Sequence, residues 1–242
     1  MVELTTIELV NGILSIIFVS ISIIIGTKIA SKYFKYKQRT FLLVGITWIG
    51  LVSLWYSHVI SVLLILTTGN GISDRLYMFL GNALLPFTWF IWIIAFTDLV
   101  CKDKQKIFLI ISAIYGAVVE IYFLFYLFTD PSILGEVLSP VDAKYNLVMT
   151  LYQFSCLIMI VITGILFARI SMKSDNPEIK VKGKFLLFAL ISFFVGAIFE
   201  IFSYISIIFL IIGRLILISS AIEFYCGFIL PKRVKELFLK QK

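Results

Sequence analysis

Long runs of apolar residues, separated by short polar connections, make up most of the sequence. The runs approach or exceed the length of about 20 residues that an α-helix needs to cross the hydrocarbon core of a bilayer. Backbone groups in lipid must find hydrogen-bond partners within their own segment, and no run alternates apolar and polar residues like the strands of a membrane barrel, so helices are predicted. Seven spans follow, over residues 8–29, 40–66, 77–100, 107–129, 147–169, 185–204 and 208–230.

The predicted fold is therefore all-α, a polytopic membrane protein with a bundle of seven transmembrane helices over residues 1–230 and a short basic tail over residues 231–242. In the tail, Val234, Leu237 and Phe238 recur at helical spacing with basic residues between them. Such a segment is typical of an amphipathic helix on the inner membrane surface. The alternative is a frayed basic end.

The boundary between the sixth and seventh spans is the hardest to place. Residues 185–230 would measure about 69 Å as one helix, at 1.5 Å per residue, so the chain must turn within them. We expect the turn near Ser203–Ile207, and Gly213-Arg214 is the competing position. The connections at 67–74 and 130–146 contain Gly, Asn and Pro residues typical of turns, so any ligand would have to meet the helical bundle itself.

Lys and Arg residues are sorted to one side of the predicted spans. Of the 21, 18 fall in or next to the first, third and fifth connections and in the tail, the opposite side carries only Arg75 and Lys144, and Arg214 lies in or near a span. Cytoplasmic loops carry such an excess, so the N-terminus is predicted outside and the C-terminus inside a cell membrane. The first ten residues carry Glu3 and Glu8 rather than a basic region, so the first run is expected to be a retained span and not a cleaved signal peptide.

The composition supports a lipid environment. Apolar residues make up 61% of the chain and charged residues only 14%, whereas soluble domains carry about 25% charged residues. The net charge of +7 arises from the connections, where it serves topology and contact with anionic lipid, so no nucleic-acid partner is expected.

Sequence motifs for catalysis or cofactor binding are not found. The chain contains no Walker loop, Rossmann glycine pattern, HExxH or nucleophile elbow, and its three cysteines have no metal-type spacing. Residues 208–230 contain no lysine for a retinal Schiff base. We therefore expect no enzyme activity, no catalytic or metal site and no cofactor.

Ionisable residues within spans are costly in lipid and often functional. Glu120, Glu200 and Arg214 fall at similar depths in the predicted outer half, so they are candidates for one charge cluster. Such a cluster would bind a polar ligand or change state on protonation. The alternative is an ion-pair network that only fixes helix register.

Other polar residues in spans are candidates for the same site or for the inner face. His58 lies in the outer part of the second span, as a pH-sensing group or as a hydrogen-bonded interfacial histidine. Asn82 and Pro86 interrupt the third span, where a proline kink leaves room for a ligand or water, although many membrane helices carry proline without function. Asp98 and Glu223, near the inner ends of their spans, would neutralise loop lysines or relay protons.

The third span carries a family resemblance. It contains Pro86 followed by aromatic residues, within Arg75–Phe90, and ends in Ala95-Phe96-Thr97-Asp98. This pattern resembles the seven-helix sensor region at the N-terminus of certain bacterial and archaeal histidine kinases. The resemblance implies a sensor bundle without the kinase, since the chain ends about a dozen residues after Pro231, and a signal passed to a separate cytoplasmic protein. It identifies no ligand and no site residue.

The preferred hypothesis is thus a receptor-like or sensory seven-helix membrane protein without a catalytic output domain. The rival is a small transporter or channel with a polar site in the bundle. Transporters often have repeated halves with broken helices, and no convincing repeat is found here. A structural membrane scaffold comes third.

The predicted orientation can be tested with terminal tags. A membrane-impermeant reagent applied to intact cells should reach a tag at the N-terminus, whereas a tag at the C-terminus should react only after the membrane is permeabilised. Labelling of the C-terminal tag in intact cells would contradict the orientation.

Overall fold

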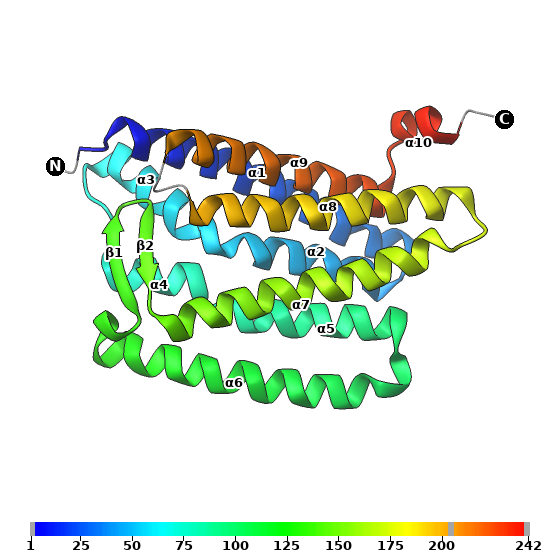
Figure 1. Cartoon of the computed structure of the whole chain (residues 1–242), viewed down its shortest axis with the longest axis horizontal. Helices are drawn as coiled ribbons and strands as arrows, with labels where there is room; N and C mark the ends of the chain where they lie inside the picture. Colours follow the sequence, from blue (N-terminus) through cyan, green and yellow to red (C-terminus); the bar gives the residue numbers. More distant parts are fainter. Residues whose placement is uncertain (1–2, 203–205, 240–242) are drawn as a thin grey trace.

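The computed structural model describes residues 3–202 and 206–239 and is built almost entirely of helices (Figure 1). Seven helical segments are long and apolar enough to cross a membrane, which confirms the predicted all-α polytopic fold. Five of the seven are single helices: α1 (Thr6–Tyr36), α6 (Gln105–Thr129), α7 (Leu147–Met172), α8 (Pro177–Ile201) and α9 (Ile207–Ile229). Two short 3₁₀ turns, η2 (Lys102–Lys104) and η3 (Pro131–Ile133), flank α6.

The second and third spans are each interrupted. The second consists of α2 (Arg39–Leu51), the 3₁₀ turn η1 (Val52–Trp55) and α3 (Tyr56–Thr68). The third consists of α4 (Asp74–Asn82) and α5 (Leu85–Val100). The break in the third span was predicted, whereas nothing in the sequence had indicated the 3₁₀ turn in the second.

Pro86 accounts for the break in the third span. In a continuous helix its ring would clash with the carbonyl of Asn82, so the helix is broken before it. Pro86 instead occupies the first turn of α5, where a backbone N–H has no partner within the helix and its absence costs nothing. At the break, the Asn82 side chain donates back to the Met78 carbonyl at 3.0 Å. The side chain of Asn82 thereby stays fixed inside the bundle, where it is 1% exposed.

The helices pack as a bundle with α6 at its edge (Figure 1). Helix α1 packs against α2, α3 and α9, and α8 packs between α7 and α9. Helix α5 joins α2, α6 and α7, whereas α6 has its largest contacts with α5. The position of α6 leaves most of its side chains facing outward.

A β-hairpin closes one end of the bundle, where the connection at 130–146 had been interpreted as a turn. Strands β1 (Gly135–Ser139) and β2 (Asp142–Tyr145) pair antiparallel, with Gly135 opposite Tyr145 (Figure 1). A Cβ at Gly135 would lie 2.3 Å from the Lys144 carbonyl oxygen, so this pairing requires glycine. We call this end the hairpin end and the opposite end, where most Lys and Arg residues lie, the basic end.

The predicted turn between the last two spans falls mainly on residues 203–205, which lie outside the described residues. Helix α8 ends at Ile201 and α9 begins at Ile207, capped by the Ser206 hydroxyl. The competing turn position at Gly213 is wrong, because this residue lies inside α9.

The tail forms α10 (Lys232–Leu239) at the basic end, so residues 232–239 are helical and not frayed (Figure 1). Lys235 of α10 forms an ion pair with Glu178 of α8, and the Phe238 ring meets the Phe185 ring edge-on at 5.3 Å. Leu237 is 77% exposed, as expected for a side chain that would face lipid in an amphipathic surface helix.

Small residues allow α1 and α2 to approach closely. A Cβ at Gly45 would lie 2.4 Å from the Gly26 carbonyl oxygen, whereas a Cβ at Gly116 would lie 3.4 Å from the Pro86 Cβ. We therefore expect Gly45→Ala to lower the free energy of unfolding by about 1–3 kcal/mol through overpacking. The matched Gly116→Ala should be neutral or slightly stabilising, since Ala favours helix. Thermal unfolding in detergent measures both, and equal stability of the two variants would contradict the close contact.

Candidate functional site

A buried ion pair lies between the last two spans, near the hairpin end. Arg214 Nη2 of α9 lies 3.0 Å from Glu200 Oε2 of α8, and the side chains are 0% and 17% exposed. Two of the three residues predicted to cluster are therefore in direct contact. In hydrocarbon such a pair is stable only when both charges are compensated where they stand.

Further polar and aromatic side chains surround Arg214. Its Nη2 donates to Asn11 Oδ1 of α1 at 2.7 Å and lies 3.5 Å from His58 Nδ1 of α3. Because a guanidinium only donates, this His58 nitrogen acts as an acceptor, and the ring is neutral in this arrangement. The guanidinium carbon also lies 5.6 Å from the centre of the Trp55 ring, at a cation–π distance. Trp55 Nε1 in turn donates to Glu200 Oε2 at 3.3 Å.

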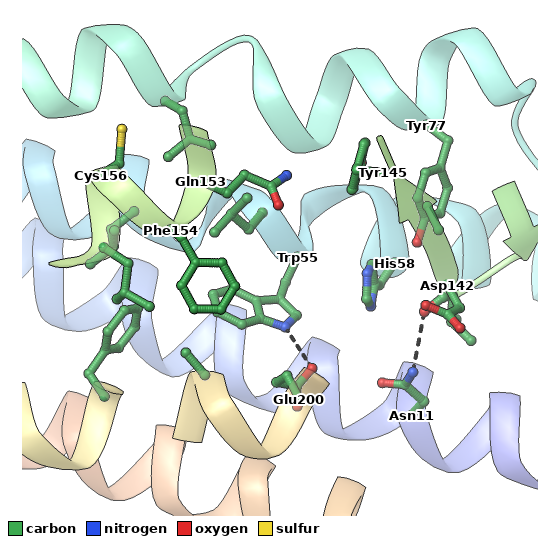
Figure 2. Close-up of a pocket in the computed structure, with 18 residues that line it drawn as sticks. Asn11, Trp55, His58, Tyr77, Asp142, Tyr145, Gln153, Phe154, Cys156 and Glu200 are labelled. Atoms are coloured by element: carbon green, nitrogen blue, oxygen red, sulfur yellow. Dashed lines mark hydrogen bonds between the residues drawn. The ribbon is translucent and has the colours of Figure 1, made fainter. Parts of the chain in front are cut away.

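A cavity of about 250 Å³ adjoins this pair (Figure 2). Its walls come from α1, the interrupted second and third spans, α7 and α8, and β2 contributes to its lining. Glu200, His58 and Asn11 line it directly, whereas Arg214 lies behind them and is not part of the lining. The charge pair thus presents its carboxylate, not its guanidinium, to the cavity.

Two hydrogen-bonded links hold the hairpin over the cavity. Asn11 Nδ2 donates to the Val141 carbonyl at 3.3 Å, and Asn82 Nδ2 donates to the Tyr145 hydroxyl at 2.9 Å. Gln153 of α7 donates to Asn82 Oδ1 at 2.7 Å and so fixes its orientation. The predicted candidate Asn82 therefore contacts the hairpin over the cavity and does not contact the charge pair.

The hairpin also brings titratable side chains to the cavity. Asp142 lines it, and burial raises the pKa of its carboxyl above the ordinary value. Burial likewise raises the pKa of the Tyr145 phenol to about 12, so this hydroxyl keeps its proton at physiological pH. Asp142 forms no ion pair among the residues that the structure describes.

Several polar atoms at this site have no hydrogen-bond partner in the described part of the chain. They include the Tyr77 hydroxyl and Glu200 Oε1 next to the cavity, and Nε and Nη1 of Arg214 behind it. Tyr77 is only 2% exposed, and its hydroxyl lies on the side of the cavity that also holds His58 and Asp142 (Figure 2). Buried polar groups usually find partners, so these atoms mark the cavity as a place for a polar guest.

Glu120 does not join the cluster, which corrects the prediction. It lies half-buried on α6, the edge helix that packs mainly against α5. The sequence predicted a similar depth in the membrane for Glu120, Glu200 and Arg214. Glu120, however, lies on a different side of the bundle, and sequence spacing does not determine that position. Its carboxylate forms no ion pair with any described residue.

The two acidic residues near the basic end have structural partners. Asp98 forms an ion pair with Arg39 and accepts from Gln105 Nε2 at 2.9 Å, so an arginine and not the expected lysines neutralises it. Glu223 accepts from the Ser219 hydroxyl at 2.8 Å and has no cationic partner within the described ranges. Neither residue lines the cavity.

Six other residues of the site were missed by the sequence analysis. Asn11, Trp55, Tyr77, Asp142, Tyr145 and Gln153 line the cavity but were not among the predicted candidates. Asn11 and Gln153 are polar residues inside apolar runs, so the rule that selected the ionisable residues would have found them if it had included amides. Over residues 3–202 and 206–239, no cluster of His, Cys, Asp and Glu could hold a metal ion.

Neither the protein-family models nor the curated proteins include a match to this chain.

The charge pair predicts an asymmetric response to substitution. Glu200→Gln leaves a buried guanidinium that cannot lose its proton, so unfolding should become easier by about 3–5 kcal/mol. Arg214→Met leaves a carboxyl that a proton can neutralise, so this variant should lose less free energy of unfolding than Glu200→Gln. The double variant should recover part of the loss, and Glu120→Gln, which breaks no ion pair, should have little effect. Thermal unfolding in detergent tests the order, and a double variant no more stable than Glu200→Gln would contradict it.

Proposed function

We propose that this protein is a receptor-like, sensory seven-helix protein of the cell membrane. A small ligand would enter from the outside, bind in the cavity at the hairpin end and change the state of the bundle. The output would pass at the basic end to a separate cytoplasmic signalling protein. The resemblance of the third span to the sensor regions of histidine kinases agrees with this role.

The observation that carries the proposal is the cavity itself. It is partly enclosed, it adjoins a buried charge pair, and part of its lining belongs to a hairpin at the end predicted to face outward (Figure 2). Concave sites with apolar walls and a few convergent polar groups are the usual form of small-molecule sites. The apolar spans supply the lipid environment in which such a receptor would work.

Helix α8 offers a physical connection between the cavity and the basic end. Glu200, near its last turn, lines the cavity, and Glu178, in its first turn, forms an ion pair with Lys235 of α10. A ligand that binds two arrangements of α8 with different affinity would shift their populations, and α10 would move with it. The tail is therefore the proposed contact for the cytoplasmic partner.

The rival function is transport, and the interrupted second and third spans favour it. Broken helices near the middle of the membrane are common at transporter sites. On the basic-end side of the cavity, however, the path meets packed aromatic rings: Phe193 contacts Trp48 at 5.7 Å, and Trp48 stacks on Phe224 at 4.0 Å between ring centres. This layer supports a closed site over a continuous pathway.

Flux measurements separate the two functions. Liposomes that contain the purified protein should leak protons and small ions no faster than empty liposomes, and Asp142→Asn, which alters the cavity lining without breaking an ion pair, should change nothing. Robust flux that is abolished by Asp142→Asn but kept in Glu120→Gln would assign a transport pathway to the cavity and defeat the receptor proposal.

A further inference from the structure

The charges that face the cavity are negative. Glu200 and Asp142 line it, and no Lys or Arg does. Arg214 contacts Glu200 only through Oε2, so Oε1 is left without a partner among the described residues. The neighbouring His58 is neutral in this arrangement, because its Nδ1 faces a donor of Arg214.

Asp142 lies on the exposed side of the hairpin and borders the cavity without an ion-pair partner among the described residues. Burial beside the bundle raises the pKa of its carboxyl, as expected for a carboxylate that is partly removed from water. A cation placed next to this carboxylate would replace the lost hydration. Nothing in the described part of the chain supplies that cation, since the ion pairs found there all involve other residues.

Aromatic faces make up much of the remaining wall. Trp55, Tyr77, Phe154 and Phe193 line the cavity. Aromatic rings attract organic cations through the negative potential of their faces, and ammonium ligands are recognised in this way. One of these rings, Trp55, already lies at a cation–π distance from the Arg214 guanidinium, 5.6 Å from its carbon to the ring centre.

The cavity has a polar part and an apolar part. Asn11, His58, Tyr77 and Asp142 gather on one side, whereas Phe154 and Cys156 lie on the other (Figure 2). The Tyr77 hydroxyl, which has no partner among the described residues, and the free oxygen of Glu200 are acceptors for the N–H groups of an ammonium. Leu51, Leu54 and Leu157 add apolar surface to the lining.

From these contacts we infer that the cavity binds a small organic cation, an ammonium group carried on an apolar or aromatic body. This deepens the proposed receptor function and rests on it. The ammonium lies between Glu200 and Asp142, and the body lies against Phe154 and the leucines. A volume of about 250 Å³ is below the roughly 300–1,000 Å³ of sites for drug-sized ligands, so the ligand is a small amine.

An organic anion is the less suitable guest. Its carboxylate would face Glu200 and Asp142 without a cation in the lining, because Arg214 lies behind Glu200 and Asn11. A neutral ligand would gain no charge-assisted hydrogen bond from Glu200 or Asp142. The two carboxylates therefore select for the sign of charge as well as for the size of the ligand.

Binding of three probes of nearly the same shape tests this inference: phenethylamine as cation, phenethyl alcohol as neutral form and phenylacetate as anion. Purified protein in lipid nanodiscs is titrated calorimetrically with each at neutral pH. Phenethylamine should bind at least about tenfold more tightly than the other two, the difference expected for one charge-assisted hydrogen bond.

Asp142→Asn is the informative variant, because the residue lies on the exposed side of the hairpin and breaks no ion pair. It should weaken phenethylamine binding about tenfold and leave phenethyl alcohol unchanged. Glu136→Gln removes the same charge from the same hairpin without touching the cavity lining, and it should bind phenethylamine like the unaltered protein.

The outcomes separate this inference from the proposed function. Equal or tighter binding of phenethyl alcohol or phenylacetate would overturn the amine inference and leave a ligand cavity in place. Binding of none of the three probes would also overturn it, and the flux experiment would then decide independently between receptor and transporter. Equal loss in Asp142→Asn and Glu136→Gln would show a general effect of hairpin charge and not a contact in the cavity.

Discussion

The arrangement of the hairpin end depends on one constraint: a charge in a low-dielectric interior must be compensated where it stands. Arg214 is fully buried, so every element around it has to supply an acceptor or an aromatic face. Glu200, Asn11 and His58 do so from α8, α1 and α3. The same Asn11 then donates to the hairpin backbone. The charge pair and the cover of the cavity are thus joined by a single amide side chain, which explains why polar residues accumulate at this end of an otherwise apolar bundle.

The interrupted spans provide the space that this cluster needs. The third span is broken directly after Asn82, the last residue of α4, whose side chain contacts Tyr145 and Gln153. The 3₁₀ turn at Val52–Trp55 similarly changes the helical phase of the second span, and both Trp55 and His58 line the cavity. Elsewhere the helices pack closely, as at Gly26 and Gly45, so the cavity is a local feature of the hairpin end.

The two ends of the bundle have different chemistry, and α8 connects them. The cavity at the hairpin end is lined by acidic and aromatic side chains, whereas the basic end carries lysines, arginines and the amphipathic α10. Glu200 and Glu178 lie at opposite ends of the same helix, one in a buried ion pair with Arg214 and the other paired with Lys235. An aromatic layer of Trp48, Phe193 and Phe224 fills the region between the cavity and the basic end. Packed rings of this kind leave few voids, so the cavity is bounded by close packing on this side.

The sequence by itself determined the seven helices, the sorting of basic residues and the break at Pro86, because length, hydropathy and proline geometry act locally along the chain. For the tail it left a helix and a frayed end open, and the structure shows the helix. The sequence also indicated Glu200 and Arg214 as partners, since both are ionisable residues in lipid at similar depth. It did not reveal that Glu120 lies outside the charge cluster, on the edge helix α6, or that Asn11 and Tyr77 reach the site. Nor did it reveal that residues 135–145 fold into a hairpin, although Asp142-Ala143-Lys144-Tyr145 alternates polar and less polar residues. Only the tertiary structure decided these points. Depth in the membrane follows from residue count, but the rotation of each helix and its place around the bundle follow from side-chain packing between segments far apart in the chain.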